Sequence, residues 1–412
     1  MLARTRTAGA VTAVSLVLAL VVMAGPAAAG PTVPLTIGST SAYAIFAEPG
    51  VGTYGSNDTA ILTHLKNLVN GTPCPAAGAS PPVIRAAVNS LGNGDLPTQI
   101  KDALVAKHNC GVDVRVIVNG SEKSSTAAQS LRTGLGTAAF EWCDHDDSTN
   151  SKGGGCVSTH SSSAMHTKLM MFSNTSGSSC VVWFGSANLT NATGGETFNN
   201  GVTLYNNCTL HTLFKDRIWQ PMWDEWTVAN NDFYQPTSQG YLSSGNVTVH
   251  ASPENGSSIT DFVLGRLNGL TSGNGCTVGV SEAMWTTRGY SNTADASGEA
   301  VARRLAALKT GSGGCSIGVV VGNKPDGTAN IDSGPRTILT NAGIPIEHGP
   351  VHDKYFFMNH ASKPFTVVTG SHNFSLPAWR HNDEALVEIS NSQSTYDAYY
   401  NHWFATLGVA VP

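Results

Sequence analysis

Residues 166–188 read HTKLMMFSNTSGSSCVVWFGSAN, and residues 352–373 read HDKYFFMNHASKPFTVVTGSHN. Both stretches open with a His-x-Lys triplet, continue as an apolar run, pass through turn residues and close with Gly-Ser-x-Asn. The lysine and the glycine are 17 positions apart in the first stretch and 16 in the second. One His-x-Lys triplet arises easily by chance, but two copies with the same sequel do not. The chain is therefore interpreted as a duplication.

Each stretch predicts a β-hairpin. The apolar runs at 168–172 and 354–358 are nearly continuous, which is typical of strands buried on both faces. After the turn residues, 181–184 and 365–368 predict the returning strands. Each Gly-Ser-x-Asn element should therefore lie beside the His-x-Lys triplet of its own half.

The polar residues of these hairpins form the candidate site. Side chains two positions apart share a face of a strand, so histidine lies with lysine and serine lies with asparagine. Burying such groups without a ligand is costly, which favours a site that holds an anion. The residues are His166, Lys168, Ser186 and Asn188 in the first half, and His352, Lys354, Ser371 and Asn373 in the second.

The segments before each hairpin keep the same order in both halves. A strand, a helix and a second strand are predicted, which indicates parallel pairing with right-handed crossovers. A further helix should open each half. The sequence thus predicts an α/β protein of two mixed β-sheets flanked by helices, with the active site at the interface of the halves. The ranges are 57–69, 83–88, 96–107 and 112–118, then 257–267, 277–282, 298–308 and 316–321.

The start of the chain has the pattern of a secretory signal peptide. Arg4 and Arg6 precede an apolar run over about 8–22, and Ala27-Ala28-Ala29 fits a cleavage site. We therefore expect residues 1–29 to be removed and the protein to be secreted. No later apolar run approaches the roughly 20 residues that a bilayer requires.

The remainder divides into two halves joined by a linker. Residues 236–246 are rich in Ser and Gly and have neither helical nor strand periodicity, which predicts a linker. The first half then spans 30–235 and the second half 247–412. Because one chain supplies both half-sites, we expect a monomer.

The eight cysteines predict four disulfides, since an exported protein meets an oxidising compartment. The duplication favours two pairs that bracket equivalent segments, while the others would close a short loop and join neighbouring strands. No Cys-x-x-Cys spacing occurs, so we expect neither a cysteine metal site nor a cofactor. The expected pairs are Cys74–Cys110, Cys276–Cys315, Cys143–Cys156 and Cys180–Cys208.

The paired motifs resemble those of the phospholipase D superfamily, whose members carry HxK and GSxN in each half of a duplicated phospholipase D-like fold. The resemblance extends over essentially the whole mature chain and is greatest to the secreted bacterial members. One departure lies five positions after each lysine, where Ser173 and Asn359 replace the usual aspartate. The resemblance implies a supporting role for that aspartate, away from the substrate.

A second departure concerns the partner of the catalytic histidine. The family commonly has a carboxylate 11 positions after the GSxN asparagine, and this is Glu384 in the second half. The first half has Asn199 there, with Glu196 as a nearby alternative. The two histidines should therefore differ in basicity.

The resemblance implies double displacement at phosphorus through a phosphohistidine intermediate, with His166 as the nucleophile and His352 as general acid and base. Lys168 and Lys354 would balance the charge, and the serines and asparagines would donate hydrogen bonds to phosphoryl oxygens. No metal is required. Because Glu384 belongs to the same half as His352, the order of the two histidines stays open.

The expected reaction is hydrolysis of phosphatidylcholine-type phospholipids, at a membrane or micelle surface, to phosphatidic acid and free headgroup. The chain has 23 basic and 28 acidic residues and lacks the basic clusters that hold nucleic acid. The alternatives are a metal-independent nuclease of the same superfamily and a catalytically silent binding protein. Trp285 and Trp379 either contact lipid or pack in the core.

Overall fold

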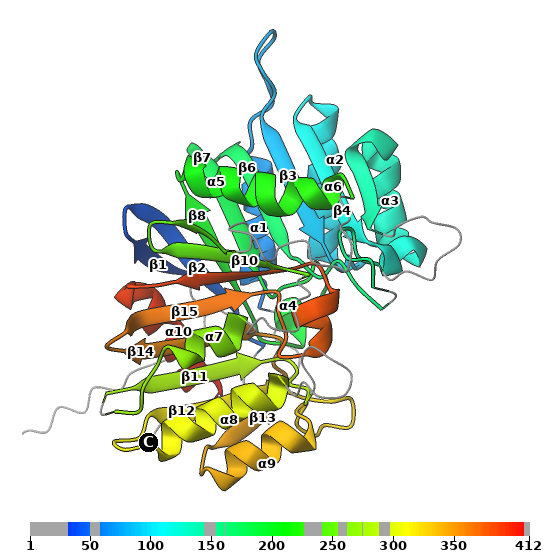
Figure 1. Cartoon of the computed structure of the whole chain (residues 1–412). Helices are drawn as coiled ribbons and strands as arrows, with labels where there is room; N and C mark the ends of the chain where they lie inside the picture. The colour runs from blue at the N-terminus through cyan, green and yellow to red at the C-terminus, as the bar shows by residue number, and fades with distance from the viewer. Residues whose placement is uncertain are drawn as a thin grey trace, which may run out of the picture.

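A computed structural model gives the fold of the chain. It describes residues 32–49, 58–143, 154–160, 162–225, 241–253, 262–273, 275–287 and 297–407. The predicted signal peptide lies outside the described residues. Two eight-stranded mixed sheets, one from each half, lie one above the other in Figure 1.

The first sheet has the strand order β1-β2-β8-β7-β6-β3-β4-β5. The parallel pair β3–β4 and the antiparallel hairpin β6–β7 are as predicted. The centre of β6 is buried on both faces, which accounts for its continuous apolar run. The strands are β1 (Thr32–Ile37), β2 (Thr40–Ala47), β3 (Val83–Val88), β4 (Asp113–Asn119), β5 (Phe140–Cys143), β6 (Leu169–Thr175), β7 (Ser178–Gly185) and β8 (Asn199–Tyr205).

The second sheet repeats this order, read from its other edge, as β9-β10-β16-β15-β14-β11-β12-β13. The predicted parallel pair is β11–β12, and the predicted hairpin is β14–β15. The duplication is therefore confirmed strand by strand. The strands are β9 (Tyr241–Ser244), β10 (Val247–Ser252), β11 (Thr277–Glu282), β12 (Ser316–Gly322), β13 (Ile346–Gly349), β14 (Lys354–His360), β15 (Lys363–Gly370) and β16 (Glu384–Ile389).

Helices lie on both faces of each sheet (Figure 1), and one hydrophobic core takes side chains from both sheets. One outer layer holds α1 (Ala60–Gly71), α2 (Asp95–Asn109) and α3 (Thr126–Leu135), and the other holds α7 (Phe262–Asn268), α8 (Ser297–Thr310) and α9 (Ser333–Asn341). The central core takes side chains from α5 (Cys208–Phe214), a π-helical turn (Lys215–Trp219), α6 (Gln220–Trp223) and α10 (Gln393–Leu407). A short α4 (Ala192–Gly195) follows the first Gly-Ser-x-Asn element.

Two equivalent tryptophans fix the inner helices to their sheets. Trp219 donates its indole N–H to the carbonyl of Ala86 on β3, and Trp403 donates to Val280 on β11, each at 3.1 Å. Ala86 pairs with Met170 and Val280 pairs with Phe356, each two positions after a motif lysine. The inner helices of the two halves are therefore equivalent in position.

The predicted linker is wrong in part. Residues 241–244 form β9, which pairs with β10 in the second sheet. Gly245, at φ 58°, and Asn246 make the tight turn of this hairpin. The segment reads as a loop because its turn residues outnumber its apolar ones, but backbone hydrogen bonds at a sheet edge suffice to make a strand.

All four expected cysteine pairs are joined in the structure: Cys74–Cys110, Cys143–Cys156, Cys180–Cys208 and Cys276–Cys315. In the part of the chain that the structure describes, no helix combines the length and the apolar character needed to span a membrane.

Candidate active site

The two motif sets meet where the halves join. His166 and Lys168 stand immediately before β6, while His352 precedes β14. Isolated bridges tie the halves together at this point, joining Met165 to Asp383 and Phe198 to Val351. Each histidine is influenced electrostatically by both motif lysines, so the predicted groups form one site.

Glu384 is hydrogen-bonded to His166, the histidine of the other half. Its carboxylate lies 2.9 Å from Nδ1 of His166, and the Glu384 side chain is 1% exposed. Ser371 donates its hydroxyl to the same carboxylate at 2.5 Å, and Asn382 donates at 3.1 Å. Glu384 therefore serves the histidine of the other half, because β16 brings its first residue to the opposing half-site.

Asn199 makes the reciprocal contact. Its Oδ1 lies 2.9 Å from Nδ1 of His352, and Ser186 donates to Oδ1 at 3.2 Å. Asn199, rather than Glu196, is therefore the partner of the second histidine. A carbonyl oxygen at Nδ1 requires a proton there, so Nε2 is the unprotonated nitrogen of the neutral ring.

The two imidazoles differ in basicity, as expected. Burial lowers the pKa of both rings, and the neighbouring lysines lower it further. The Glu384 carboxylate opposes this effect at His166, whereas no carboxylate does so at His352, whose pKa falls well below its ordinary value. His166 is therefore the more basic ring.

The motif lysines are buried and influence each other electrostatically. Burial, followed by repulsion from Lys354, lowers the pKa of Lys168 well below its ordinary value. Burial lowers the pKa of Lys354 to about 8, although Glu282 opposes this shift. Each amino group donates to the carbonyl of its own triplet's histidine, at 2.7 Å for Lys168 and 3.0 Å for Lys354. An anion between them would relieve the repulsion.

The serines and asparagines play different parts. We expected both to bind phosphoryl oxygens, but the hydroxyls of Ser186 and Ser371 hold Asn199 and Glu384 instead. Oδ1 of Asn188 and of Asn373 is buried without a partner among the described residues. An amide oxygen accepts hydrogen bonds, so only the NH₂ group of each asparagine could donate to a phosphoryl oxygen.

Three site residues escaped the sequence analysis. Asn200 accepts from the backbone N–H of Lys354 at 3.2 Å, and the carbonyl of Asp383 accepts from that of His166 at 3.0 Å. Glu282 pairs with Lys354 in the sheet and is 1% exposed. Asn200 and Asp383 adjoin predicted residues, and that adjacency was the available signal. Glu282 lies on an apolar strand far from the motif residues in sequence, so the sequence held no comparable signal for it.

The substitutes for the usual aspartate are structural. Ser173 accepts a hydrogen bond from the backbone N–H of Val83 at 2.8 Å, and Asn359 accepts one from Phe365 at 3.3 Å. Both tie strand ends together and belong to no described part of the site. A neutral acceptor is adequate for this task.

The lipid-contact alternative for the two tryptophans is wrong. Trp285 is 0% exposed and Trp379 is 2% exposed, and both belong to the outer core of the second half. Trp285 also donates its indole N–H to Gly298 at 3.0 Å. Both rings are therefore packing residues.

Sequence comparison identifies the family. Residues 85–222 and 290–407 match the family described as "Cardiolipin synthase, PLD-like domain". The chain belongs to this PLD-like family. No curated protein is similar enough in sequence to match.

Among solved structures, a phosphatidylserine synthase shares the overall fold. Phosphatidylserine synthase of Haemophilus influenzae is 10% identical with a TM-score of 0.56, over 91% of this chain and 87% of the synthase. Yeast tyrosyl-DNA phosphodiesterase is 10% identical with a TM-score of 0.41, over 84% and 89%. Nuc, a phospholipase D family member of Salmonella typhimurium, is 20% identical with a TM-score of 0.29, over 39% and 93%.

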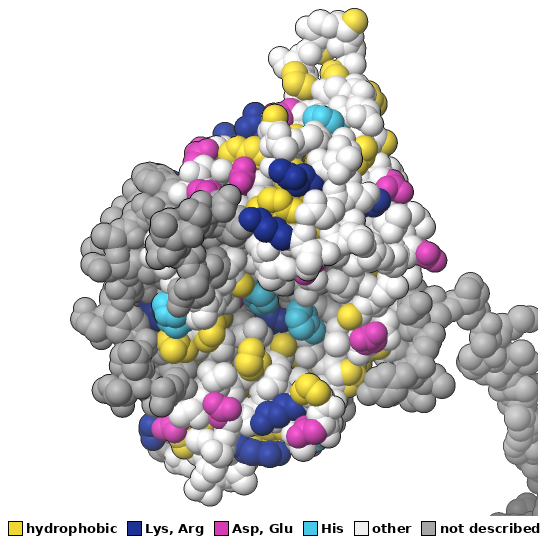
Figure 2. All heavy atoms as spheres, turned by 90° about the vertical axis from the view of Figure 1, so that its right-hand side faces the viewer, with side chains coloured by type: hydrophobic (Ala, Val, Ile, Leu, Met, Phe, Trp, Pro, Cys, Tyr) yellow, Lys and Arg dark blue, Asp and Glu magenta, His cyan; other side chains and the backbone are white. Residues whose placement is uncertain are grey.

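The PLD-like site has histidine side chains on its surface (Figure 2) and mostly apolar residues behind Lys168. Histidine side chains gather near the middle of the face shown in Figure 2. Behind Lys168 and Asn188 lies a cavity of about 10 Å³ with a largely apolar lining. The apolar residues of this lining contribute to the burial of Lys168.

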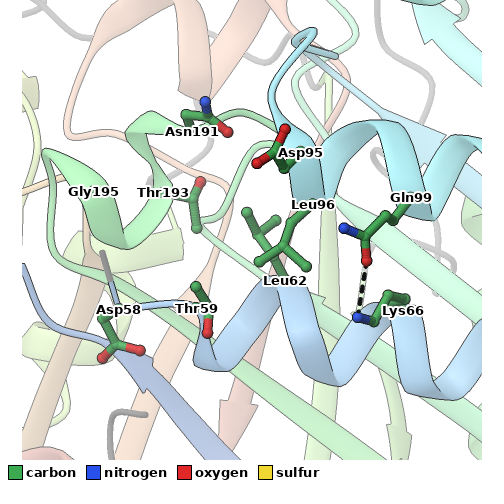
Figure 3. Close-up of a pocket in the computed structure, with 10 residues that line it drawn as sticks. All are labelled: Asp58, Thr59, Leu62, Lys66, Asp95, Leu96, Gln99, Asn191, Thr193 and Gly195. Atoms are coloured by element: carbon green, nitrogen blue, oxygen red, sulfur yellow. Dashed lines mark hydrogen bonds between the residues drawn. The ribbon is translucent and has the colours of Figure 1, made fainter. Parts of the chain in front are cut away.

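A larger cavity, of about 410 Å³, lies between the first turns of α1 and α2 and the segment 191–195 (Figure 3). Lys66 and Gln99 are hydrogen-bonded at its edge at 3.1 Å. The hydroxyl of Thr193 donates a hydrogen bond to the backbone carbonyl of Asn188 at 2.7 Å. The side chains of the His-x-Lys and Gly-Ser-x-Asn motifs are not among the residues that line this cavity. We assign it no part in the chemistry.

One group among the described residues has metal-ligand spacing, namely Cys143, Cys156 and Asp383. Its two sulfurs are joined to each other, and the Asp383 carboxylate accepts backbone N–H groups of residues 156–158. The group is therefore an anchor for this loop rather than a ligand set.

Proposed function

We propose that this protein is a secreted phosphodiesterase, a phospholipase D that hydrolyses phosphatidylcholine-type phospholipids to phosphatidic acid and a free headgroup. The phosphodiesterase activity in this proposal rests on one observation. Two histidines, each hydrogen-bonded to a residue of the other half, meet around two buried lysines that repel each other. Such a site is stabilised by a singly charged phosphodiester.

The reaction takes two displacements. Nε2 of His166 attacks phosphorus, the P–O bond to the headgroup breaks, and His352 gives its proton to the leaving oxygen. Then His352 takes a proton from water, the water oxygen attacks phosphorus, and the N–P bond to His166 breaks. The bond from Glu384 to Nδ1 of His166 supports this order, because it makes His166 the more basic ring.

The lysines and asparagines support both steps. Lys168 and Lys354 would balance the negative charge on the phosphoryl oxygens, and the amides of Asn188 and Asn373 would bind them. The negative charge of the substrate also favours the protonated form of His352, whose pKa is otherwise held low by burial and by Lys354. Substrate binding thus prepares the general acid.

A lipid substrate has separate support. The chain is net acidic, at −5, whereas nucleic-acid-binding proteins carry clustered basic residues. The matched family and the synthase of the same fold are both named for phospholipids. The predicted signal peptide and the four disulfides favour action outside the cell.

The test is a parallel assay of choline release from phosphatidylcholine vesicles and of plasmid DNA cleavage. Wild type should release choline, and His166→Ala should lose at least about 1,000-fold of kcat. Trapping the intermediate should place the phosphorus on His166 in a peptide mass map. Added chelator should leave the rate unchanged.

Each other outcome is decisive. DNA cleavage without choline release would replace the lipase by a nuclease that uses the same site. The absence of both activities would favour a catalytically silent binding protein. Phosphorus on His352 would reverse the roles of the histidines.

A further inference from the structure

His402 of α10 lies in a buried chain of charged groups that ends at the second motif. Its Nδ1 is 2.8 Å from the carboxylate of Glu48, and its Nε2 is 3.2 Å from that of Asp353. Asp353 is the central residue of the triplet His352-Asp353-Lys354. Asp353 is 0% exposed and His402 is 4% exposed, whereas the Glu48 side chain is 22% exposed, so the chain is partly open to water at Glu48 and buried at Asp353.

Both ring nitrogens face carboxylate oxygens, so both must carry protons and the ring is an imidazolium. Although burial lowers its pKa, Asp353 and Glu48 raise it to about 9. Phe46 stacks on the ring with centroids 4.1 Å apart, and Phe198 meets it edge-on at 6.2 Å. The ring is therefore held in place by charge and by packing.

Along the triplet His352-Asp353-Lys354, the first and third residues are held through their backbone N–H groups, and the central residue is held through its side chain. The backbone N–H of His352 donates to the carbonyl of Phe198 at 2.9 Å, and that of Lys354 donates to Asn200 at 3.2 Å. The side chain of Asp353 binds His402 between these two points. Successive side chains of an extended segment point to opposite sides, so His402 holds the triplet from behind the site.

In the first half, a neutral hydrogen bond holds the central residue of the His-x-Lys triplet. Thr167 stands in the place of Asp353 and donates its hydroxyl to the carbonyl of Asp383 at 3.0 Å. The residue before Trp219, equivalent to His402, is Ile218, which is 1% exposed. The charged chain is therefore not a requirement of the fold.

We propose that His402 is a positioning residue, which holds Asp353 against Glu48 and thereby fixes the direction in which His352 and Lys354 point into the site. The kinetic part of this inference rests on the proposed phosphodiesterase function. His402 itself touches neither substrate nor reacting atoms.

The test uses the double variant Asp353→Thr, His402→Ile, which copies the pair found in the first half. His402→Ile alone would leave a buried carboxylate unpaired and is expected to unfold the protein. The double variant should fold, with a circular dichroism spectrum like that of wild type. Its kcat for choline release should fall about tenfold or more while KM changes less than about threefold.

A second readout does not depend on the substrate. Asn199 holds His352 as the Nδ1–H tautomer, which gives a defined side-chain ¹H–¹⁵N spectrum. The double variant should shift the His352 signals, which are assigned by their loss in His352→Gln. Ile218→Leu, in the equivalent helix, should change neither kcat nor these signals.

A folded double variant with wild-type kcat and unchanged His352 signals would overturn the proposal. If wild type releases no choline, the proposed function fails, but the spectrum still tests the positioning role. Unchanged His352 signals in that case would also overturn it.

Discussion

At the scale of single residues, one pair of atoms decides the chemistry of each histidine. Glu384 and Asn199 occupy equivalent positions and make equivalent contacts, at 2.9 Å in both cases. One partner carries a negative charge and the other does not. We propose that the division into nucleophile and general acid follows from this difference.

Glu384→Gln should therefore lower kcat by about 100-fold or more, because His166 loses the charge that raises its basicity. The kcat/KM profile should be measured from pH 5 to 9. Asn199→Asp is the matched variant: a carboxylate would raise the pKa of His352 and move the alkaline limb to higher pH. Equal losses in Glu384→Gln and Asn199→Ala would contradict the division of roles.

The sequence predicted the motif residues of the candidate site, but it predicted neither Asn200, Asp383 and Glu282 nor the pairing of the histidines. Spacing from the asparagine locates Glu384 and Asn199 along their own strands. It cannot say which histidine each meets, because that depends on how two separate sheets face each other. Glu48 and His402, which lie 354 positions apart, were invisible for the same reason.

At the scale of elements, the equivalent indole anchors of Trp219 and Trp403 explain why two helices of different sequence take equivalent places. Helix α10 was not predicted, although Tyr396, Tyr399 and Trp403 have helical spacing and are buried. The strands that were predicted are β3, β4, β6 and β7 in the first sheet and β11, β12, β14 and β15 in the second, where the motifs and their apolar runs gave the signal. The other strands of the described residues, β8 and β16 among them, were not predicted.

Trp403→Ala and Trp219→Ala should each lower the free energy of unfolding by about 3–5 kcal/mol, since each removes a large buried ring. Urea denaturation at pH 7 measures this. The corresponding Trp→Phe variants keep most of the volume and should lose about 1 kcal/mol with the hydrogen bond. A large loss at only one tryptophan would argue against equivalent roles.

At the scale of the whole molecule, the sheets share a central core and are linked by polar bridges at the site. The chain Glu48–His402–Asp353 is one such bridge, since Glu48 belongs to the first half and the other two residues to the second. Tyr355 and Tyr399 also face this region, and burial raises the pKa of both. The association of the halves should therefore depend on pH.

The protonation of His402 sets the direction in which the stability of the protein changes with pH. Its pKa is about 9 in the folded protein against an ordinary value of 6.5, so the stability it contributes is complete below about pH 6.5 and is lost as pH rises through 9. The loss is on the order of 3 kcal/mol. Thermal unfolding between pH 6 and 10 should show this decline in wild type but not in the Asp353→Thr, His402→Ile variant. Parallel declines would contradict it.

The exchange of partners between the halves also bears on descent. After a duplication, each copy would ordinarily be free to drift towards a separate role. Here a change at position 384 alters the histidine at 166, and a change at 199 alters the one at 352. Natural selection on either copy therefore acts through the other, and these positions should vary together among descendants in the pairs 166 with 384 and 352 with 199.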